Sequence, residues 1–282
     1  MTAPKSKALP HVLTDEQVAQ FRHDGYLLIE NVLTPGETDH YRSVILDLVP
    51  RDLAFPQEWR VADGRIKPHR LHEDQTFDVP GLIPLMGNET LYQVMAQLHD
   101  TYRLRAFDGS IGITLRNDAH PDQVRSQRLH LDASVPPDTD FLFTAQELQL
   151  GGCYYLTDVE PGGGGIHVVP RGHRLVEEEV RAAGSAGVNG RELYGNWQHI
   201  AHLKSIEVSG AAGSFVLLHH LMPHAASHNR RPTARIAHFM RYVPVPHAHG
   251  AHVPLPHDRY DDTQLAAMTP LTRKLLGLDP WG

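Results

Sequence analysis

The chain has a single cysteine, no long apolar run and no dense block of basic residues. Cys153 is the only cysteine in 282 residues, so no disulfide can form within the chain. No apolar segment is long enough to span a bilayer, and the first residues lack the apolar core of a secretory signal. Net charge is −7, which disfavours binding to nucleic acid or an anionic membrane. We therefore expect a cytoplasmic protein; the sequence leaves its oligomeric state open.

What is present is an ordinary globular composition, with 41% hydrophobic and 21% charged residues. A chain of this length can bury a sizeable core and can form one large domain. We predict a single domain over 1–282, with an N-terminal helical region at about 13–101 and a β-rich core at about 103–245.

Helix signals are concentrated in the N-terminal region. Thr14 and Thr34 each precede a polar residue at the third helical position, which is the capping-box pattern, and Asn88 is a third N-cap. Gly25 would end the first helix, and residues 26–29 then form a strand.

From about residue 103 the pattern changes to short β-rich runs separated by turn residues. Such a series indicates a sandwich, a jelly roll or a barrel. The predicted strands are Leu104–Phe107, Ile111–Leu115, Gln127–Asp132, Cys153–Leu156, Ile166–Val169, Ser214–His219 and Arg235–Val243. The segment 174–204 interrupts them and is either a substrate lid or a variable surface loop.

Three His-x-Asp triplets occur, where chance alone gives about one and a half. Those at His72 and His120 lie in polar or proline-containing segments that favour loops. Only His130 and Asp132 are flanked by alternating leucines, so both would project from one face of a strand. They are either two surface residues of an edge strand or two ligands of a 2-His-1-carboxylate iron site.

A facial triad needs a second histidine from a distant strand. The segment 213–242 offers five, and the residues alone do not choose among them: His219, His220, His224, His228 and His238.

Several segments together resemble the phytanoyl-CoA dioxygenase family of Fe(II)/2-oxoglutarate oxygenases, which includes ectoine hydroxylase and many natural-product hydroxylases. Residues 13–26 are similar to the family's opening helix and strand. His130-x-Asp132 matches its iron motif, and 160–174 resembles its glycine turn. The segment 213–235 has the family's glycine, strand, distal histidine and arginine in order.

The resemblance implies a double-stranded β-helix (jelly roll, cupin-like), mainly β with flanking helices, and it implies specific ligands. In the family pattern, the distal histidine stands eleven residues after the strand's glycine and eleven before the arginine. His224 and Arg235 satisfy both counts. His219 with Arg230 is the fallback pair, but His219 follows Gly213 too closely.

The implied cofactors are Fe(II) and the co-substrate 2-oxoglutarate, with ascorbate as a reductant that keeps the iron ferrous. His130, Asp132 and His224 would bind iron and leave three positions for a bidentate 2-oxo acid and O2. Arg235 would hold the remote carboxylate, because a guanidinium fork matches it better than an ammonium. Arg241 has the same strand parity and is the alternative, and Gln127 matches a glutamine near the co-substrate.

Two positions depart from the family. Ile166 stands where many relatives carry a threonine that contacts the co-substrate, and 170–173 replaces the Pro-Gly-Ser-His signature with Pro-Arg-Gly-His. Asp132 is retained, whereas halogenases of the family replace this carboxylate with a small residue. The resemblance therefore implies a hydroxylase type, with no catalytic residues beyond the metal ligands.

We predict a dioxygenase that hydroxylates an unactivated C–H bond of a small metabolite, in natural-product biosynthesis or catabolism. The alternatives are a cupin-type metalloenzyme without 2-oxoglutarate and a non-catalytic binding jelly roll. For an acidic substrate, the candidate contacts from the sequence are Arg103, Arg105 and Arg116.

Overall fold

The computed structural model describes residues 12–51, 65–68, 79–119, 121–131, 140–141, 149–182, 184, 188–189, 203–245 and 260–282. Its helices are α1 (Asp15–Asp24), α2 (Pro35–Asp47), the 3-10 helix η3 (Pro80–Leu82), α3 (Ile83–Met86), α4 (Glu89–His99), α5 (Gly172–Ala182), α8 (Asp262–Ala266) and α9 (Pro270–Leu275). Its strands are β1 (Tyr26–Ile29), β2 (Arg65–Ile66), β3 (Leu104–Thr114), β4 (Asp140–Phe141), β5 (Leu150–Tyr155), β6 (Ile166–Val168), β7 (Val188–Asn189), β8 (Ile206–Val208), β9 (Phe215–His219), β10 (His224–Ala226) and β11 (Arg235–Pro244).

Two antiparallel sheets form the centre of the molecule. The larger has six strands in the order β1-β9-β5-β11-β3-β2, and the smaller has three in the order β10-β6-β8. Strands that are distant in sequence are neighbours, as β1 and β9 are, which is typical of a jelly roll. The predicted jelly-roll class is confirmed.

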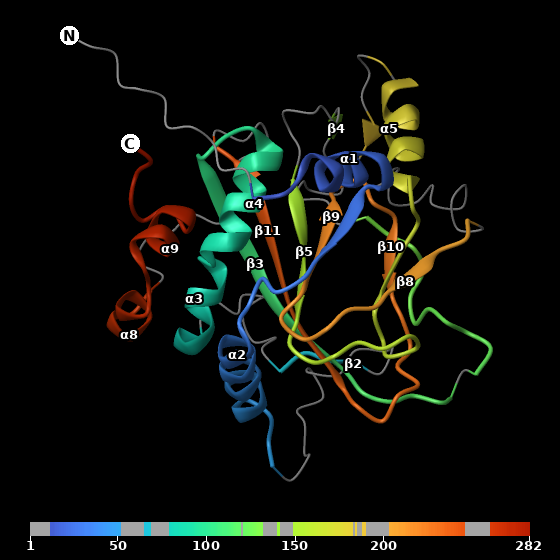
Figure 1. Cartoon of the computed structure of the whole chain (residues 1–282), viewed down its shortest axis with the longest axis horizontal. Helices are drawn as coiled ribbons and strands as arrows, with labels where there is room; N and C mark the ends of the chain where they lie inside the picture. Colours follow the sequence, from blue (N-terminus) through green and yellow to red (C-terminus); the bar gives the residue numbers. More distant parts are fainter. Residues whose placement is uncertain are drawn as a thin grey trace.

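Helices cover one face of the six-stranded sheet, and the smaller sheet lies on its other side (Figure 1). The side chains of β11 alternate accordingly. Tyr242 and Met240 join the core under the helices, whereas Ala237 belongs to a second core between the sheets. The inner face of β11 is therefore the one that lines the space between the two sheets.

The predicted helix starts are confirmed in detail. The side chains of Thr14 and Thr34 accept hydrogen bonds from the backbone N–H three residues later, and both capping boxes are complete. The Asn88 side chain caps α4 in the same way. Gly25 ends α1 in the left-handed conformation, at φ 78°.

Two strand predictions are corrected. The two predicted strands at 104–115 are one continuous strand, β3, with a register irregularity opposite His238 and Met240 of β11. Within 121–131, the predicted strand at 127–132 is reduced to a single bridge at His130. Asp132 lies outside the described ranges, as do His120 and the whole triplet at 72–74.

Helix α5 opens the predicted lid segment 174–204, and β7 within it pairs with β4. Most of the rest of that segment lies outside the described ranges. None of the helices in the described ranges is both long and apolar enough to cross a membrane.

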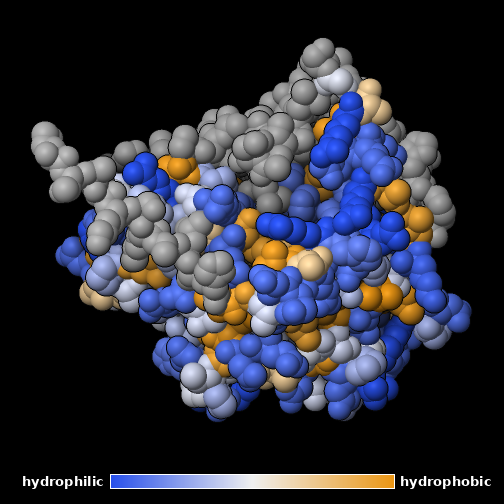
Figure 2. Space-filling view, turned by 45° about the horizontal axis from the view of Figure 1, so that its top comes forward, coloured by the Kyte–Doolittle hydropathy of each residue, from blue (hydrophilic) through white to orange (hydrophobic). Residues whose placement is uncertain are grey.

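The large apolar side chains that are exposed lie in separate elements, for example Leu46 in α2, Leu175 in α5 and Ile206 in β8. On the face shown in Figure 2, hydrophobic residues are accordingly interspersed with hydrophilic ones.

Candidate active site

His130 and His224 face each other between the two sheets. Their backbones form an isolated antiparallel bridge, in which each N–H donates to the other residue's carbonyl at 2.9 and 3.0 Å. Their ring centroids are 4.4 Å apart. The two imidazoles that the sequence assigned to one metal are therefore adjacent in the fold, although 94 positions separate them in the chain.

Each ring is oriented by a backbone carbonyl. Nδ1 of His130 lies 3.2 Å from the carbonyl oxygen of Arg128, and Nδ1 of His224 lies 2.9 Å from that of Met222. A carbonyl oxygen can only accept, so Nδ1 is the protonated nitrogen in the neutral form of both rings. Nε2 then carries the lone pair, which is how ligating histidines are commonly prepared.

The two rings thus fit a divalent metal as neutral nitrogen donors. Asp132, the predicted third ligand, follows His130 by two positions and lies outside the described ranges. Within those ranges, no group of three histidine, cysteine or acidic side chains could hold a metal.

Arg235 is the most deeply buried cation near the pair. Its side chain is only 1% exposed, and Nη2 donates to the hydroxyl of Thr114 at 2.7 Å. Nε and Nη1 are buried and have no hydrogen-bond partner among the described residues. Buried donors of a charged group lower stability unless they have a partner. An anion bound in front of Nε and Nη1 would supply that partner.

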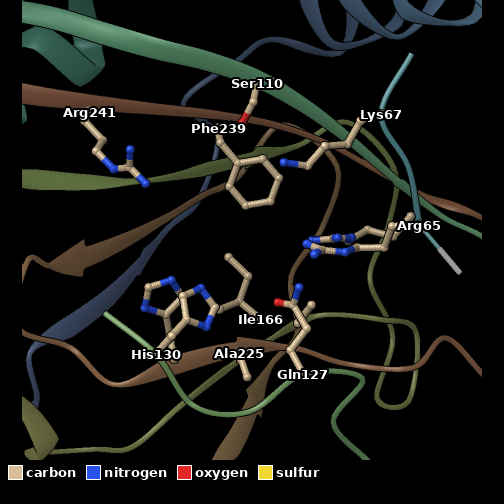
Figure 3. A pocket seen from close by; sticks show the side chains of 12 residues that line it. Arg65, Lys67, Ser110, Gln127, His130, Ile166, Ala225, Phe239 and Arg241 are labelled. Carbon is tan, nitrogen blue, oxygen red and sulfur yellow. The ribbon is translucent and has the colours of Figure 1, made fainter. Parts of the chain in front are cut away.

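A cavity of about 220 Å³ connects these groups. Figure 3 shows the labelled side chains pointing into it from both sheets and from the segment before His130. Its lining combines the predicted residues with polar, cationic and apolar neighbours: Arg65, Lys67, Ser110, Gln127, His130, Ile166, His224, Ala225, Ala226, Arg235, Phe239 and Arg241. The structure therefore brings together four of the five predicted site residues.

Ile166, the position of the departure from the family, also lines this cavity. Its backbone N–H donates to the hydroxyl of Tyr155 at 3.0 Å, and that hydroxyl donates to the carbonyl of Val208 at 2.8 Å. Ile166 is therefore fixed between the sheets and presents an apolar surface. Among the described lining residues, the uncharged polar side chains are those of Gln127 and Ser110.

The fallback pair lies elsewhere. His219 is half-buried beside His173 and His220, with ring centroids 4.9 and 4.6 Å away, and it lines a different cavity next to α1 and α5. Burial keeps the pKa of His219 well below its ordinary value. Arg230 donates to the backbone carbonyls of Asn117 and Gln123, so it holds two loops together.

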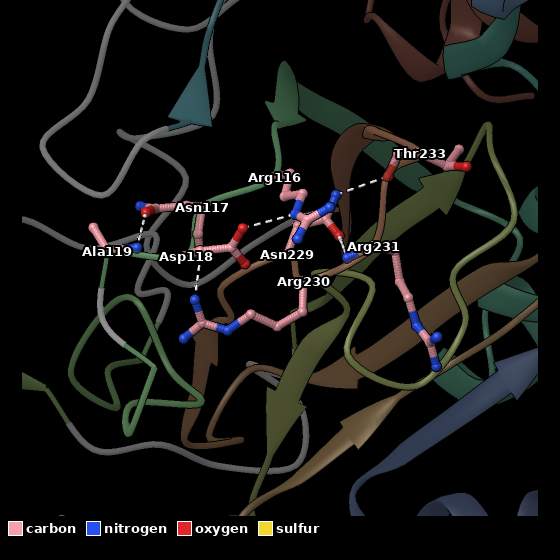
Figure 4. A network of polar contacts seen from close by, with 8 residues as sticks. All are labelled: Arg116, Asn117, Asp118, Ala119, Asn229, Arg230, Arg231 and Thr233. Atoms are coloured by element: carbon pink, nitrogen blue, oxygen red, sulfur yellow. Dashed lines mark hydrogen bonds and ion pairs between the residues drawn. The ribbon is translucent and has the colours of Figure 1, made fainter.

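Hydrogen bonds of Asn229 organise the same loop region, which precedes Arg235 in the chain (Figure 4). The Asn229 side-chain amide donates to the carbonyls of Thr114 and Thr233 at 3.1 and 2.8 Å, and its oxygen accepts from the backbone N–H of Arg231 at 2.8 Å. These bonds join the end of β3 to the loop before β11. The partner of Arg235, Thr114, is thereby held beside it.

Cys153 lies next to Phe239 on the neighbouring strand. The residue is fully buried, and burial raises the pKa of its thiol to about 12. It is therefore a neutral packing residue rather than a nucleophile.

Sequence reasoning missed several lining residues and misplaced others. Arg65, Lys67 and Ser110 were not predicted, because a two-residue strand and a local irregularity leave no periodic signal. The arginines suggested for an acidic substrate, Arg103, Arg105 and Arg116, do not line this cavity. Among these, Arg116 pairs with Asp118 at 2.7 Å on the surface.

Comparison with known proteins gives a family and a fold. The family model described as phytanoyl-CoA dioxygenase matches residues 21–237. No curated protein sequence matches the chain significantly.

Three of the solved structures that share the fold are SnoN, HygX and EctD. The non-heme alpha-ketoglutarate-dependent epimerase SnoN from nogalamycin biosynthesis is 19% identical, with 88% of this chain and 91% of that one covered and a TM-score of 0.58. HygX from Streptomyces hygroscopicus, with nickel and 2-oxoglutarate bound, is 19% identical, with 83% and 88% covered and a TM-score of 0.53. EctD from S. alaskensis, with 2-oxoglutarate and 5-hydroxyectoine, is 16% identical, with 84% and 78% covered and a TM-score of 0.56.

Proposed function

Because the chain belongs to the phytanoyl-CoA dioxygenase family of Fe(II)/2-oxoglutarate-dependent oxygenases, we propose that it hydroxylates an unactivated C–H bond of a small metabolite. One observation carries the proposal: the carbonyl-oriented pair His130 and His224 opens onto the same cavity as buried Arg235, whose Nε and Nη1 have no partner among the described residues. A metal site and an anion site in one cavity are what this co-substrate requires.

Three residues would hold the metal. His130 and His224 would provide Nε2 and Asp132 would provide a carboxylate, which is the donor set of a 2-His-1-carboxylate iron site. The backbone bridge fixes the first two residues relative to each other. We further propose that the helical region and the β core act as one domain, since helix and sheet side chains share a core.

Arg235 would bind the remote carboxylate of 2-oxoglutarate. Thr114 accepts one of its N–H groups at 2.7 Å and so fixes the plane of the guanidinium, while Nε and Nη1 remain for the ligand. Gln127 would contact the end of the co-substrate nearer the metal. Arg241 is placed less well for this role, because it is only partly buried.

The balanced reaction is substrate C–H plus 2-oxoglutarate plus O2, giving substrate C–OH plus succinate and CO2. Bound Fe(II) supplies the oxygen activation and the oxidant. The protein's own part is to orient both organic molecules and to exclude water. Ile166, Ala225 and Phe239 serve the second purpose, since they form the apolar part of the cavity wall.

The test measures binding and turnover separately. Without O2, Fe(II) and 2-oxoglutarate should produce the visible charge-transfer band of a chelated 2-oxo acid, and His130→Ala should abolish it. With O2, ascorbate and substrate, succinate and hydroxylated product should form in equal amounts. Metal binding without the band would indicate a metalloenzyme that does not use 2-oxoglutarate. Absence of both metal binding and the charge-transfer band would indicate a non-catalytic binding protein.

Hydroxylation itself is tested by the product. The similar folds include an epimerase and a carbocyclase, so a shared fold is compatible with several outcomes. Incubation under 18O2 should place one labelled oxygen in the product and one in succinate. Product without label would contradict the hydroxylase assignment.

A further inference from the structure

The aromatic ring of Phe239 packs against the buried guanidinium of Arg235. Cζ of Arg235 lies over this ring, 5.8 Å from its centroid. Both side chains line the cavity, and Figure 3 shows the ring of Phe239 projecting into it. A cation over an aromatic face is attracted to the ring, and the attraction is stronger where water is excluded. Because Arg235 is buried, its contact with Phe239 is of the stronger kind.

The two side chains meet although their Cα atoms are well separated along β11. Residues four positions apart share one face of a strand and lie about 13 Å from each other. Between them on the neighbouring strand β3 is Gly112, which lies opposite Ala237. A Cβ at Gly112 would lie 3.0 Å from Cε2 of Phe239 and 3.8 Å from Nη2 of Arg235. The ring and the guanidinium therefore approach each other above this glycine.

Gly112 provides the space for the ring. It does not have the positive φ that favours glycine, in contrast to Gly109 at 81°. The backbone at Gly112 would therefore accept another residue, but a methyl group there would be in close contact with the ring and would displace it. The missing side chain is what allows Phe239 to reach Arg235.

A β-bulge helps to direct Phe239 to this place. The register of β3 against β11 shifts between His238 and Met240, so that Gly109 and Ser110 both lie opposite Phe239. The positive φ of Gly109 is typical of such an irregularity, and bulges change the direction of nearby side chains. The position of the ring therefore depends on two features of β3, the bulge and the glycine.

Arg235 is thus held on two sides. Thr114 accepts a hydrogen bond from Nη2 at 2.7 Å, and Phe239 contacts the guanidinium through its ring. A guanidinium that is fixed in this way lies at a fixed distance from His130 and His224. A diacid that reaches from the metal to Arg235 must then match that distance with its own length.

We propose that Phe239 is a positioning residue for Arg235, and that its ring makes the site select a five-carbon 2-oxo diacid over a six-carbon one. This inference rests on the proposed function and adds the residue that sets the accepted length of the co-substrate. Without the ring, the guanidinium is free to shift, so a longer diacid fits more easily and the five-carbon acid loses part of its affinity.

The test compares three 2-oxo acids by the visible band that each forms with bound Fe(II) in the absence of O2. 2-Oxoglutarate and 2-oxoadipate are diacids with five and six carbons, whereas 2-oxopentanoate has five carbons and no remote carboxylate. The wild type should bind 2-oxoglutarate at least about tenfold more tightly than 2-oxoadipate, as expected for one additional methylene group in a fixed site. The monoacid cannot pair with Arg235, so its affinity reports on the metal end alone.

Phe239→Leu keeps an apolar side chain but removes the aromatic face. It should weaken 2-oxoglutarate binding about three- to thirtyfold, reduce the preference over 2-oxoadipate at least about threefold, and change 2-oxopentanoate binding less than about twofold. Phe21→Leu is the matched control, because this buried ring lines the other cavity. It should leave the affinities for all three acids unchanged.

Gly112→Ala tests the space beneath the ring. It should weaken 2-oxoglutarate binding about two- to fivefold, because the added methyl group displaces Phe239. In the Phe239→Leu background the shorter side chain no longer reaches this position, so the same replacement should change the affinity less than about twofold.

The inference is overturned if the wild type does not distinguish the two diacids, or if Phe239→Leu leaves their ratio unchanged. It is also overturned if Phe239→Leu weakens the monoacid as much as 2-oxoglutarate, or if Phe21→Leu has the same effect. Equal effects of Gly112→Ala in both backgrounds would contradict the part assigned to the glycine. Absence of the band with all three acids in the wild type would instead overturn the proposed function.

Discussion

His130 and His224 exchange two backbone hydrogen bonds, and their rings lie 4.4 Å apart as a direct result. The spacing of the two imidazoles is thus set by main-chain geometry rather than by side-chain packing alone. Each ring is then turned by a carbonyl two residues earlier in its own segment, Arg128 for one and Met222 for the other. Both rings are thus oriented to present Nε2. This geometry assigns His224, and not His219, as the second histidine of the pair.

Replacing His224 should abolish metal binding, whereas replacing His219 should not. We expect His224→Ala to lower Fe(II) affinity at least about 100-fold, because it removes a ligand and not only a residue that orients one. His219→Ala should retain the charge-transfer band with 2-oxoglutarate, since His219 lines the other cavity. Anaerobic titration followed by visible absorption measures both. The reverse pattern would reinstate His219 as the ligand.

Arg235 and Thr114 should contribute unequally to 2-oxoglutarate binding. Arg235→Gln removes the charge and should cost about one charge-assisted hydrogen bond, 1.5–3 kcal/mol, because the amide keeps a donor; the KM for 2-oxoglutarate should therefore rise about 10- to 150-fold. Thr114→Val removes only the group that orients the guanidinium, at about 0.5–1.5 kcal/mol, and should raise it about two- to tenfold. Succinate formation at varied 2-oxoglutarate measures both. Equal effects of the two variants would contradict the assigned roles.

The sequence could predict residues that the fold brings to one cavity, because their signals are periodic or have fixed spacing. Strand alternation, together with the family's eleven-residue intervals, selected His130, His224 and Arg235, and all three line one cavity. Helix caps at Thr14 and Thr34 were equally readable, because a capping box is a local interaction within four residues.

What could not be predicted depends on register and irregularity. Arg65 reaches the cavity because β2 pairs with β3 opposite Thr114, and a two-residue strand carries no pattern that would reveal this pairing. Ser110 faces inward where the register of β3 shifts against β11, near Gly109 at φ 81°. A register shift reverses which residues face the cavity, and nothing local in the sequence marks it.

Two glycines should respond oppositely to replacement by alanine. Gly25 has φ 78°, and an added Cβ would meet the ring of His173 and lie 2.6 Å from the terminal carbon of Met222. Gly25→Ala should therefore lower the free energy of unfolding by about 2–4 kcal/mol, from backbone strain and overpacking. Gly36, in the first turn of α2, has nothing within 4 Å. Gly36→Ala should raise stability by up to about 1 kcal/mol, because alanine restricts the unfolded chain.

Chemical denaturation of the two variants at one pH measures this difference. Both replacements add a single methyl group, so each serves as the control for the other. A loss of stability in Gly36→Ala as large as that in Gly25→Ala would show that packing at Gly25 is not the cause.

His238 should make the fold sensitive to acid. Its side chain is fully buried on the helix-facing side of β11, and burial lowers the pKa of its imidazole from 6.5 to about 3. Below pH 6.5 the unfolded chain binds a proton there that the folded chain does not, so stability falls as the pH decreases toward 3. The loss from this residue is at most about 1.4 kcal/mol per pH unit, and it ends once the folded protein is protonated too.

His238→Gln cannot titrate, so its unfolding free energy should fall less steeply than the wild type's between pH 6 and 4. Denaturant titrations across this range measure the two slopes, and the range above pH 7, where the curves should run parallel, is the internal control. Equal slopes between pH 6 and 4 would mean that the buried imidazole is not what couples folding to acid.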